Sequence, residues 1–328
     1  MANVRIKAVD IYHPEKSVNN EFYIEHFKQR GKDINRFLEH MGRKDRYIID
    51  NEHENGLTMG IEAAKRVLEK SNMAGKDIDM IVFSTQIPEQ SFPTNATFLH
   101  DAIGAHKNTI VIDSNANCAG MTVAVEQACR YMKSNPNIKT ALVVGSDYNS
   151  LVCNPEDEIT YSNYGDAAAA VILEMTEEDT GFIDSIYFTD SVSRKNIMYP
   201  ENGLSNALQD RADGKYIRWI PFDGTESMPY VYESFETLMS TYNLTPNDIA
   251  AYCLSQFALA NIKLIQNKFD IDDEKIVYVG DRFGYTGTSS PFLALHEGIE
   301  SGRIKRGDHI IFWTIGAGYQ IITMLYKY

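Results

Sequence analysis

The chain is poor in positive charge and has no long apolar run. Lys and Arg number 31 against 45 Asp and Glu, which gives a net charge of −14, and no uninterrupted basic block occurs. Nucleic acids and anionic membranes are bound by basic surfaces, so neither is an expected partner. No segment holds the roughly 18 consecutive apolar residues that cross a bilayer, and the amino terminus lacks the apolar core of a signal peptide.

Cysteine is scarce as well. The four cysteines, Cys118, Cys129, Cys153 and Cys253, form no CxxC pair in 328 residues. In a chain of this length the pattern is typical of reduced thiols and predicts a cytoplasmic protein. None of the eight histidines stands at zinc-ligand spacing with a cysteine, and glycine-rich nucleotide motifs are missing. We expect neither a metal nor a redox cofactor.

Apolar runs alternate with segments of helical spacing. Helical spacing is clearest over residues 57–68 and 121–132. The runs, which indicate buried strands, are 80–83, 110–112, 141–144, 168–173, 276–279, 310–313 and 321–325. Strand and helix in alternation predict an α/β fold with covered sheets.

The sequence also repeats itself. Residues 65–86 and 236–256 both follow the order helix, polar turn, Asp-Ile, strand, Ser, Gln. A second pair, 110–134 and 276–301, follows the order strand, turn, helix. Two copies in the same order predict a duplicated half.

The repeat sets the expected boundaries. An acidic stretch near residues 174–180 separates the copies and predicts halves at 1–175 and 176–328. Residues 192–227 fit neither copy, and a long irregular insertion in a compact fold usually serves as a binding loop or lid.

Cys118 is the candidate nucleophile. It lies in Asn115-Ala-Asn-Cys-Ala-Gly-Met-Thr122, between a buried strand and a helix. The positive end of a helix favours a thiolate, so we expect the pKa of Cys118 to fall. A buried structural cysteine is the alternative interpretation of the same pattern.

Several segments together resemble the 3-oxoacyl-(acyl-carrier-protein) synthase III family of thiolase-fold condensing enzymes, over essentially the whole chain. The cysteine turn is the first of them. The others are Gly42-Arg-Lys-Asp-Arg46 (Gly-Ile-x-x-Arg in the family), Ser91-Phe-Pro-Thr94, Tyr164-Gly-Asp-Ala-Ala-Ala-Ala-Val171, Ser301-Gly-Arg-Ile-Lys-Arg-Gly-Asp308 and Gly316-Ala-Gly-Tyr319.

The resemblance implies a thiolase fold with α-β-α-β-α layers and a homodimer. Cys118 would take an acyl group from an acyl-CoA or acyl-carrier-protein thioester. The N–H groups of Cys118 and Ala317 would form the oxyanion hole. Phe92, in the loop that resembles the family's dimer-interface loop, would reach into the partner's tunnel.

The sequence departs from the family at both partners of the cysteine. The family's His precedes Ala-Asn, but here no His precedes Asn261; Ser255 or Ala258 stands at its position, and Gln256 is the nearest polar candidate. Tyr285 stands where the family has Asn. Gln cannot act as a base near neutral pH, whereas Tyr could donate to an oxyanion. We therefore expect acylation of Cys118, whereas the replacement of both partners argues against decarboxylative condensation.

The expected substrate site rests on fewer matches. Lys263 matches a basic residue near the family's carrier-protein entrance, with a solvated helix face as the alternative. Phe92, Trp219, Phe222 and Met228 are candidates for the acyl tunnel, with core packing as the alternative. The family's Trp–Arg pair around the CoA adenine is replaced by Arg36 and His40, which favours a carrier-protein donor.

Two functions are therefore weighed. The first is an acyltransferase of the synthase III type in fatty-acid or polyketide-type synthesis, with or without decarboxylation. The second is a catalytically weak partner subunit of a heteromeric ketosynthase, which the loss of the His favours and the retained cysteine turn opposes.

Overall fold

A computed structural model describes residues 3–209 and 214–328, and two sheets form its centre. The first sheet has the strand order β1-β7-β6-β4-β5. β4 pairs in parallel with β5 and β6, whereas β7 runs antiparallel to β6 and β1. The strands are β1 (Asn3–Tyr12), β4 (Met80–Ser84), β5 (Ile110–Ser114), β6 (Thr140–Asp147) and β7 (Ala167–Thr176).

The second sheet repeats this arrangement. Its order is β11-β12-β13-β8, with β11 parallel to β12 and β13 antiparallel to both of its neighbours. The strands are β8 (Gly181–Thr189), β11 (Ile249–Leu254), β12 (His309–Gly316) and β13 (Gln320–Lys327). β11, β12, β13 and β8 thus correspond to β4, β6, β7 and β1. A division at 175/176 into two domains remains a prediction.

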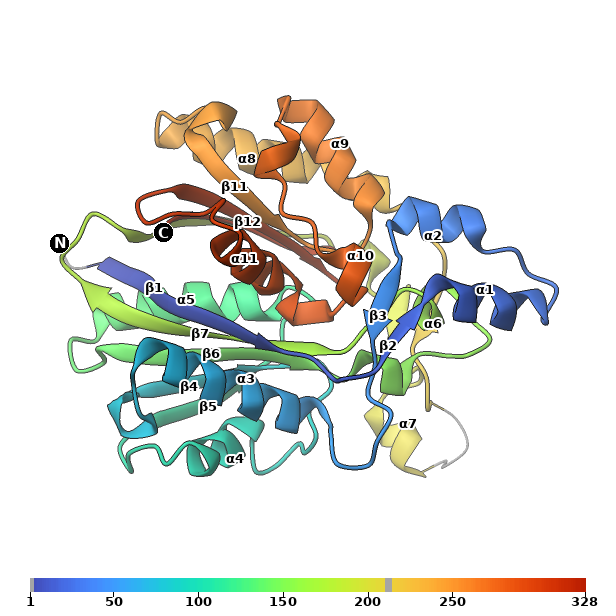
Figure 1. Cartoon of the computed structure of the whole chain (residues 1–328), viewed down its shortest axis with the longest axis horizontal. Helices are drawn as coiled ribbons and strands as arrows, with labels where there is room; N and C mark the ends of the chain where they lie inside the picture. Colours follow the sequence, from blue (N-terminus) through green and yellow to red (C-terminus); the bar gives the residue numbers. More distant parts are fainter. Residues whose placement is uncertain (1–2, 210–213) are drawn as a thin grey trace.

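Helices cover both sheets and fill the space between them (Figure 1). α3 (Gly56–Ser71) and α4 (Asn95–Ala102) lie on the outer face of the first sheet, and α8 (Met228–Thr241) and α9 (Leu259–Phe269) lie over the second. α5 (Gly120–Ser134) and α11 (Ser290–Glu300) lie between the sheets and are apolar on most sides, because both sheets pack on them. The expected α-β-α-β-α layering is confirmed.

Most of the predicted strands are present, but residues 276–279 are not a regular strand. They meet β11 at one bridge, between Tyr252 and Ile276. The Gln256 side chain takes the hydrogen bonds that a ladder would supply, since its Oε1 accepts from the Val279 and Gly280 N–H groups. The run is apolar because it is buried, and buried position alone does not make a strand.

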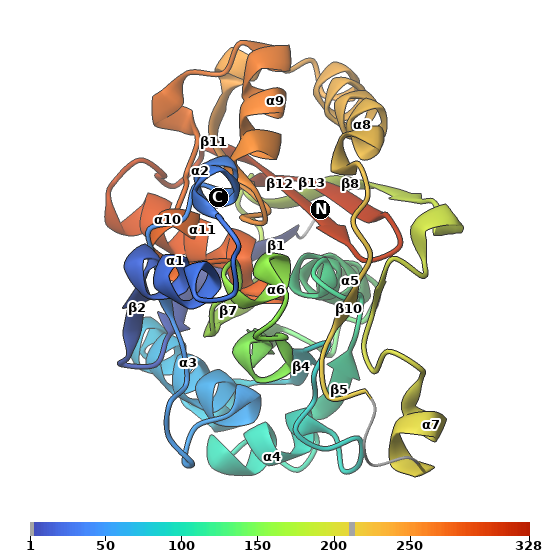
Figure 2. The same ribbon diagram turned by 90° about the vertical axis from the view of Figure 1, so that its right-hand side faces the viewer.

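The remaining elements lie at one end of the layers and in the insertion (Figure 2). At that end are β2 (Ser17–Asn19), α1 (Asn20–Lys28), α2 (Asn35–Met41), β3 (Asp45–Tyr47), α6 (Glu158–Tyr161) and α10 (Gly280–Phe283). The predicted insertion 192–227 is not wholly irregular: it contains β9 (Ile197–Met198), α7 (Leu204–Gln209) and β10 (Arg218–Trp219). Residues 210–213 of this predicted loop, like residues 1–2, lie outside the described residues.

Candidate active site

Cys118 lies in the turn between β5 and α5, beyond the carboxyl end of the parallel strands. The turn is tight, since Asn117 has a left-handed backbone with φ 52°, a conformation that Asn tolerates better than most residues. The Cys118 side chain lines a cavity of about 440 Å³. A buried structural role for this cysteine does not explain a side chain that faces a cavity.

The Cys118 thiol is less acidic than the sequence predicts. Burial raises its pKa to about 11, against the opposing effect of the Tyr285 side chain. The start of α5 does little to counter this burial, because its N–H groups are already engaged. The Gly120 N–H donates to the Asn117 carbonyl, and the Met121 N–H donates to Thr288 Oγ1 at 2.6 Å. The expectation of a lowered pKa is therefore wrong.

Gln86, which follows β4, is one polar side chain that contacts the sulfur. The Cys118 Sγ donates to Gln86 Oε1 over 3.9 Å, and Gln86 lines the same cavity. Gln86 is not among the site residues predicted from the sequence. It could have been found from the repeat, because Gln86 is the counterpart of Gln256 in the first copy.

Gln256 does not reach the cavity. Its Nε2 donates to the carbonyls of Leu254 (2.7 Å) and Val277 (3.3 Å), and its Oε1 accepts from Val279 and Gly280. The side chain is fully buried and has no group left for a substrate. The prediction that Gln256 stands in for the missing His is corrected on this point: Phe257 and Ala258, the next two residues, line the cavity instead.

Arg43 holds the segment that carries Phe257. Its buried guanidinium donates to the carbonyls of Gln256 and Phe257, each at 2.6 Å. Further bonds reach Met41 O, Asn163 O, Asn163 Oδ1, Gly280 O and Tyr278 Oη. Arg43 replaces the apolar residue of the Gly-Ile-x-x-Arg pattern, so a buried cation here ties together segments of the cavity wall.

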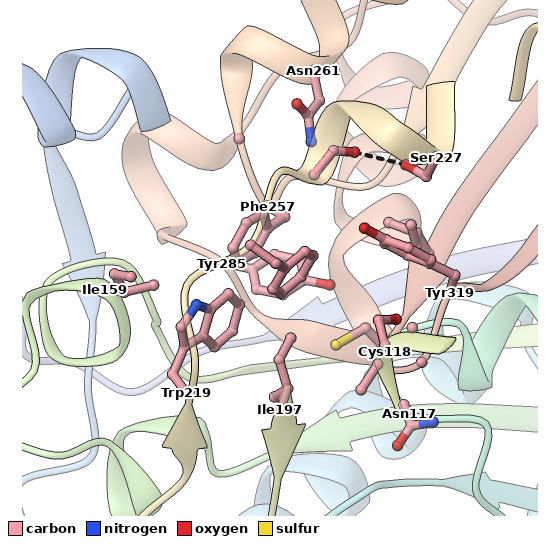
Figure 3. A pocket seen from close by; sticks show the side chains of 18 of the residues that line it. Asn117, Cys118, Ile159, Ile197, Trp219, Ser227, Phe257, Asn261, Tyr285 and Tyr319 are labelled. Carbon is pink, nitrogen blue, oxygen red and sulfur yellow. Dashed lines mark hydrogen bonds between the residues drawn. The ribbon is translucent and has the colours of Figure 1, made fainter. Parts of the chain in front are cut away.

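Tyr285 is brought to the sulfur, as the sequence predicts. Its side chain is buried, and its hydroxyl points toward Cys118 in Figure 3. The Phe257 ring meets the Tyr285 ring edge-on at 5.2 Å between centroids, and Tyr164 lies 5.4 Å away on the same measure. Burial keeps the pKa of both phenols well above the ordinary value, so both remain neutral donors at pH 7.

The turn at Ala317 also faces the cysteine turn. Gly316, Ala317 and Gly318 line the cavity with Cys118. A Cβ at Gly316 would come within 3.1 Å of the Ala116 carbonyl, which shows how closely the two turns approach. Such proximity suits an oxyanion hole shared between the Cys118 and Ala317 N–H groups; that role remains a prediction.

Aromatic side chains form one part of the cavity wall, and the predicted substrate residues divide between wall, core and surface. Met228 is buried in the core over the second sheet and does not line the cavity, so it is not a tunnel residue. Trp219 stacks on Phe257 (5.5 Å between centroids) and lies near Phe222, and these residues line the cavity together with Asn261. Lys263 is exposed on α9 and does not line the cavity.

Phe92 does not reach the cavity of its own chain. Its side chain is 87% exposed on the loop before α4. The prediction concerns a partner's tunnel, and an exposed Phe at this place leaves that prediction standing.

Charge is sparse around the thiol. Among the cavity-lining residues in the described part of the chain, His40 is the only histidine and Asp223 is the only residue with a formal charge. Behind Gln86, Asp147 is fully buried, and burial raises its pKa to about 6. The site therefore has a thiol and hydrogen-bond donors but no histidine beside the sulfur.

Comparison with known proteins shows which family has this sequence pattern and fold. The family model of 3-oxoacyl-[acyl-carrier-protein (ACP)] synthase III matches residues 112–191, and the model of its C-terminal part matches 239–328. The chain is 31% identical to the beta-ketoacyl-[acyl-carrier-protein] synthase III of Pseudoalteromonas atlantica, over 88% of each chain. It is 28% identical to that of Clostridium perfringens, over 97% of each.

Solved structures show the same fold. The 3-oxoacyl-[acyl-carrier-protein] synthase III of Aquifex aeolicus superposes with a TM-score of 0.87 over 99% of this chain and all of its own, at 23% identity. A priming beta-ketosynthase of the R1128 polyketide pathway superposes with a TM-score of 0.89 over 99% and 96%, at 20% identity. The fold is thus the thiolase fold of the condensing enzymes. Within that class, the chain belongs to the 3-oxoacyl-(acyl-carrier-protein) synthase III family.

No described helix is both long and apolar enough to span a membrane.

Proposed function

We propose that Cys118 accepts an acyl group from a thioester and passes it to an acceptor, as an acyltransferase of the synthase III type. The observation that carries the proposal is the cavity itself: Cys118, the Tyr285 hydroxyl and the Ala317 turn line one space of about 440 Å³. A nucleophile, a neutral donor and a close backbone turn are the parts that acyl transfer uses.

The first step needs no net base. Sγ of Cys118 forms a bond to the thioester carbonyl carbon, and the bond from that carbon to the donor's sulfur breaks. The proton that leaves Cys118 ends on the donor's sulfur, which departs as a thiol. Because one thiol replaces another, the missing His slows the exchange but does not forbid it.

The second step distinguishes two chemistries. Decarboxylative condensation produces an enolate, which the family stabilises with a His and an Asn. Here the wall offers Phe257, Ala258 and Tyr285, and no lysine or arginine lines the described cavity to receive a malonyl carboxylate. We therefore favour transfer of an uncharged acyl group to an acceptor that needs little base assistance.

The donor is proposed to arrive over α9. Lys263 is exposed there, next to Asn261 in the cavity wall, and His40 is exposed on the facing α2. An acidic carrier protein docking on a chain of net charge −14 needs a local positive group. We favour a carrier-protein thioester over CoA as the donor. We also propose that the protein works in the cytoplasm, where its four free thiols would stay reduced.

A homodimer is proposed through the edge of the first sheet. β5 is the last strand of that sheet, and the exposed Ile112 makes it an apolar edge. Unpaired apolar edges are normally covered, and pairing with a second copy would cover this one. Phe92 would then be buried against the partner.

The test of the proposal is intact-mass measurement after incubation with acyl-CoAs and acyl-carrier proteins. A mass increase of one acyl group, absent in Cys118→Ala, is expected. If no donor adds mass to the wild-type protein, the acyltransferase proposal fails.

The second candidate is a weak partner subunit of a heteromeric ketosynthase. It is favoured by one observation, the raised pKa of Cys118 with no histidine beside it. It predicts a complex with a second, different chain in native lysate. A self-dimer as the sole species, both purified and in lysate, would exclude this candidate.

A further inference from the structure

The orientation of the Gln86 amide is fixed from behind by a buried carboxylate. Gln86 Nε2 donates to Asp147 Oδ2 (3.2 Å) and to Asn149 Oδ1 (3.3 Å), and the Gln86 backbone N–H donates to Asp147 Oδ1 (2.9 Å). Asn149 is itself fixed, because its Nδ2 donates to the Gly165 carbonyl. Exchanging the oxygen and nitrogen of Gln86 would set its oxygen against two acceptors. The carbonyl oxygen is therefore the end that faces Cys118.

Asp147 has no freedom to release the amide. Each of its oxygens accepts two hydrogen bonds, the other donors being Thr85 Oγ1 and the Thr288 N–H. Gly287 packs so closely behind it that a Cβ there would meet Asp147 Oδ2 at 2.5 Å and Gln86 Nε2 at 3.1 Å. A left-handed glycine, with φ 62°, closes this side of the network.

We propose that Gln86, locked by Asp147, accepts the S–H bond of Cys118, keeps this cysteine a thiol, and directs its lone pairs into the cavity. A catalytic role for Gln86 rests on the proposed function, in which the Cys118 sulfur is the reacting atom. Gln86 then acts as a hydrogen-bond acceptor in contact with the nucleophile, and Asp147 is a positioning residue that acts through it. Neither takes the proton, which leaves with the donor's sulfur in the exchange.

The chemistry of an amide explains the consequence. A carbonyl oxygen stabilises the S–H form and opposes a negative charge on sulfur, and an amide accepts no proton at neutral pH. The titratable groups around Cys118 are Tyr285, Tyr164 and Asp147, reached from the loop after α10, the turn after α6 and the end of β6. Tyr285 favours the thiolate, and Asp147 opposes it.

The test is the pH dependence of iodoacetamide alkylation, read at each cysteine by peptide mass, for the wild type and three variants. Gln86→Met keeps the length but removes the acceptor. Gln86→Glu restores the acceptor. One oxygen of the new carboxyl shares a proton with Asp147, and its other oxygen faces Cys118. Gln90→Met, on the same segment but outside the cavity lining, is the matched control.

We expect Gln86→Met to raise the alkylation rate of Cys118 at pH 8 about tenfold, which corresponds to a lower midpoint by about one pH unit. Gln86→Glu and Gln90→Met should keep the wild-type midpoint or a higher one. An unchanged or higher midpoint in Gln86→Met would overturn the proposal, because it would mean that the amide is idle or turns to donate to the thiolate. Cys129, Cys153 and Cys253, all buried, must stay unmodified, since unfolding would expose them.

A second readout separates orientation from ionisation. The rate of acylation by a thioester is divided by the alkylation rate of the same protein at the same pH. This ratio should fall at least about tenfold in Gln86→Met and recover in Gln86→Glu, because a bound donor needs a directed sulfur and a small diffusing reagent does not. If no thioester acylates even the wild type, the proposed function fails while the alkylation profiles still decide the role of Gln86.

Discussion

The two halves place a glutamine at the end of equivalent strands and use it differently. Gln86 follows β4 and faces the sulfur, whereas Gln256 follows β11 and hydrogen-bonds to backbone groups. The difference lies in the next strand. β5 pairs with β4 at five positions, but its counterpart at residues 276–279 makes one bridge, and Gln256 supplies the missing bonds. A residue is free for chemistry where the backbone around it is already satisfied.

The turns that follow differ in the same way. The turn before α5 presents Cys118, and the equivalent turn before α11 presents Tyr285. Thr288 of the second turn accepts from the Met121 N–H of the first helix, so the second half supports the helix start that follows Cys118. One half thus carries Cys118, the proposed nucleophile, and the other supplies donors and packing.

The largest effect is expected at Cys118. Its absence would contradict the assignment of the nucleophile to the first half. Cys118→Ala should abolish acylation by every thioester donor, because no other cysteine lines the described cavity. Intact mass after incubation with the preferred donor is the measurement. An adduct that persists in Cys118→Ala would move the nucleophile elsewhere.

The next largest effect is a difference in the free energy of unfolding between variants of the two glutamines. Gln256→Leu removes four buried hydrogen bonds, two to backbone N–H groups and two to carbonyls, so the free energy of unfolding should fall by about 3–5 kcal/mol. Gln86→Met removes one of four donors to Asp147 and should cost only about 1 kcal/mol. Urea denaturation of both variants gives the difference. Equal losses would show that the halves are not used differently.

Tyr285→Phe tests the support given by the second turn. The Tyr285 hydroxyl lowers the pKa of Cys118, so its removal should raise that pKa above about 11 and reduce the thiolate fraction at pH 8. Alkylation and acylation should both slow about tenfold, the equivalent of one pKa unit. Alkylation by iodoacetamide across pH 7–10 is the measurement. A faster reaction in Tyr285→Phe would mean that the hydroxyl accepts from the thiol instead.

Much of the fold follows from local pattern, and the site follows from it only in part. The strands β4, β5, β6, β7, β12 and β13 and the helices α3 and α5 are apolar runs or periodic segments, which the sequence displays directly. The position of Cys118 in a strand–turn–helix unit is equally local. β1 and β8 were not predicted; both are edge-side antiparallel strands with partly exposed patterns.

The side-chain environment of the site depends on distant contacts. The roles of Gln86 and Gln256 are set by Asp147 and by residues 277–280, which no spacing in the chain reveals. The pKa of Cys118 differs from the sequence-based prediction for the same reason. A helix start predicts a low pKa, but a threonine 167 residues away occupies an N–H group of that helix start, and burial dominates.

The smallest effect concerns the segments beyond the two glutamines. The segment after Gln86 leads to the exposed Phe92 and α4, and the segment after Gln256 leads to α9 with Lys263. If the first faces a second copy and the second faces the donor, Lys263→Glu should raise the KM for an acyl-carrier protein about threefold to fivefold and leave an acyl-CoA unchanged. One exposed charge contributes little at physiological salt, and less as salt rises.

Lys268→Glu is the matched control on the same helix, since Lys268 is paired with Glu236 at 3.1 Å and does not line the cavity. Its KM for the carrier protein should stay within twofold of the wild type, and its dimer mass should not change. If both variants weaken the carrier protein equally, the effect comes from net charge rather than from a docking position at Lys263. If Lys263→Glu instead weakens the dimer, α9 faces the second copy, and the two segments have exchanged the roles that the comparison gives them.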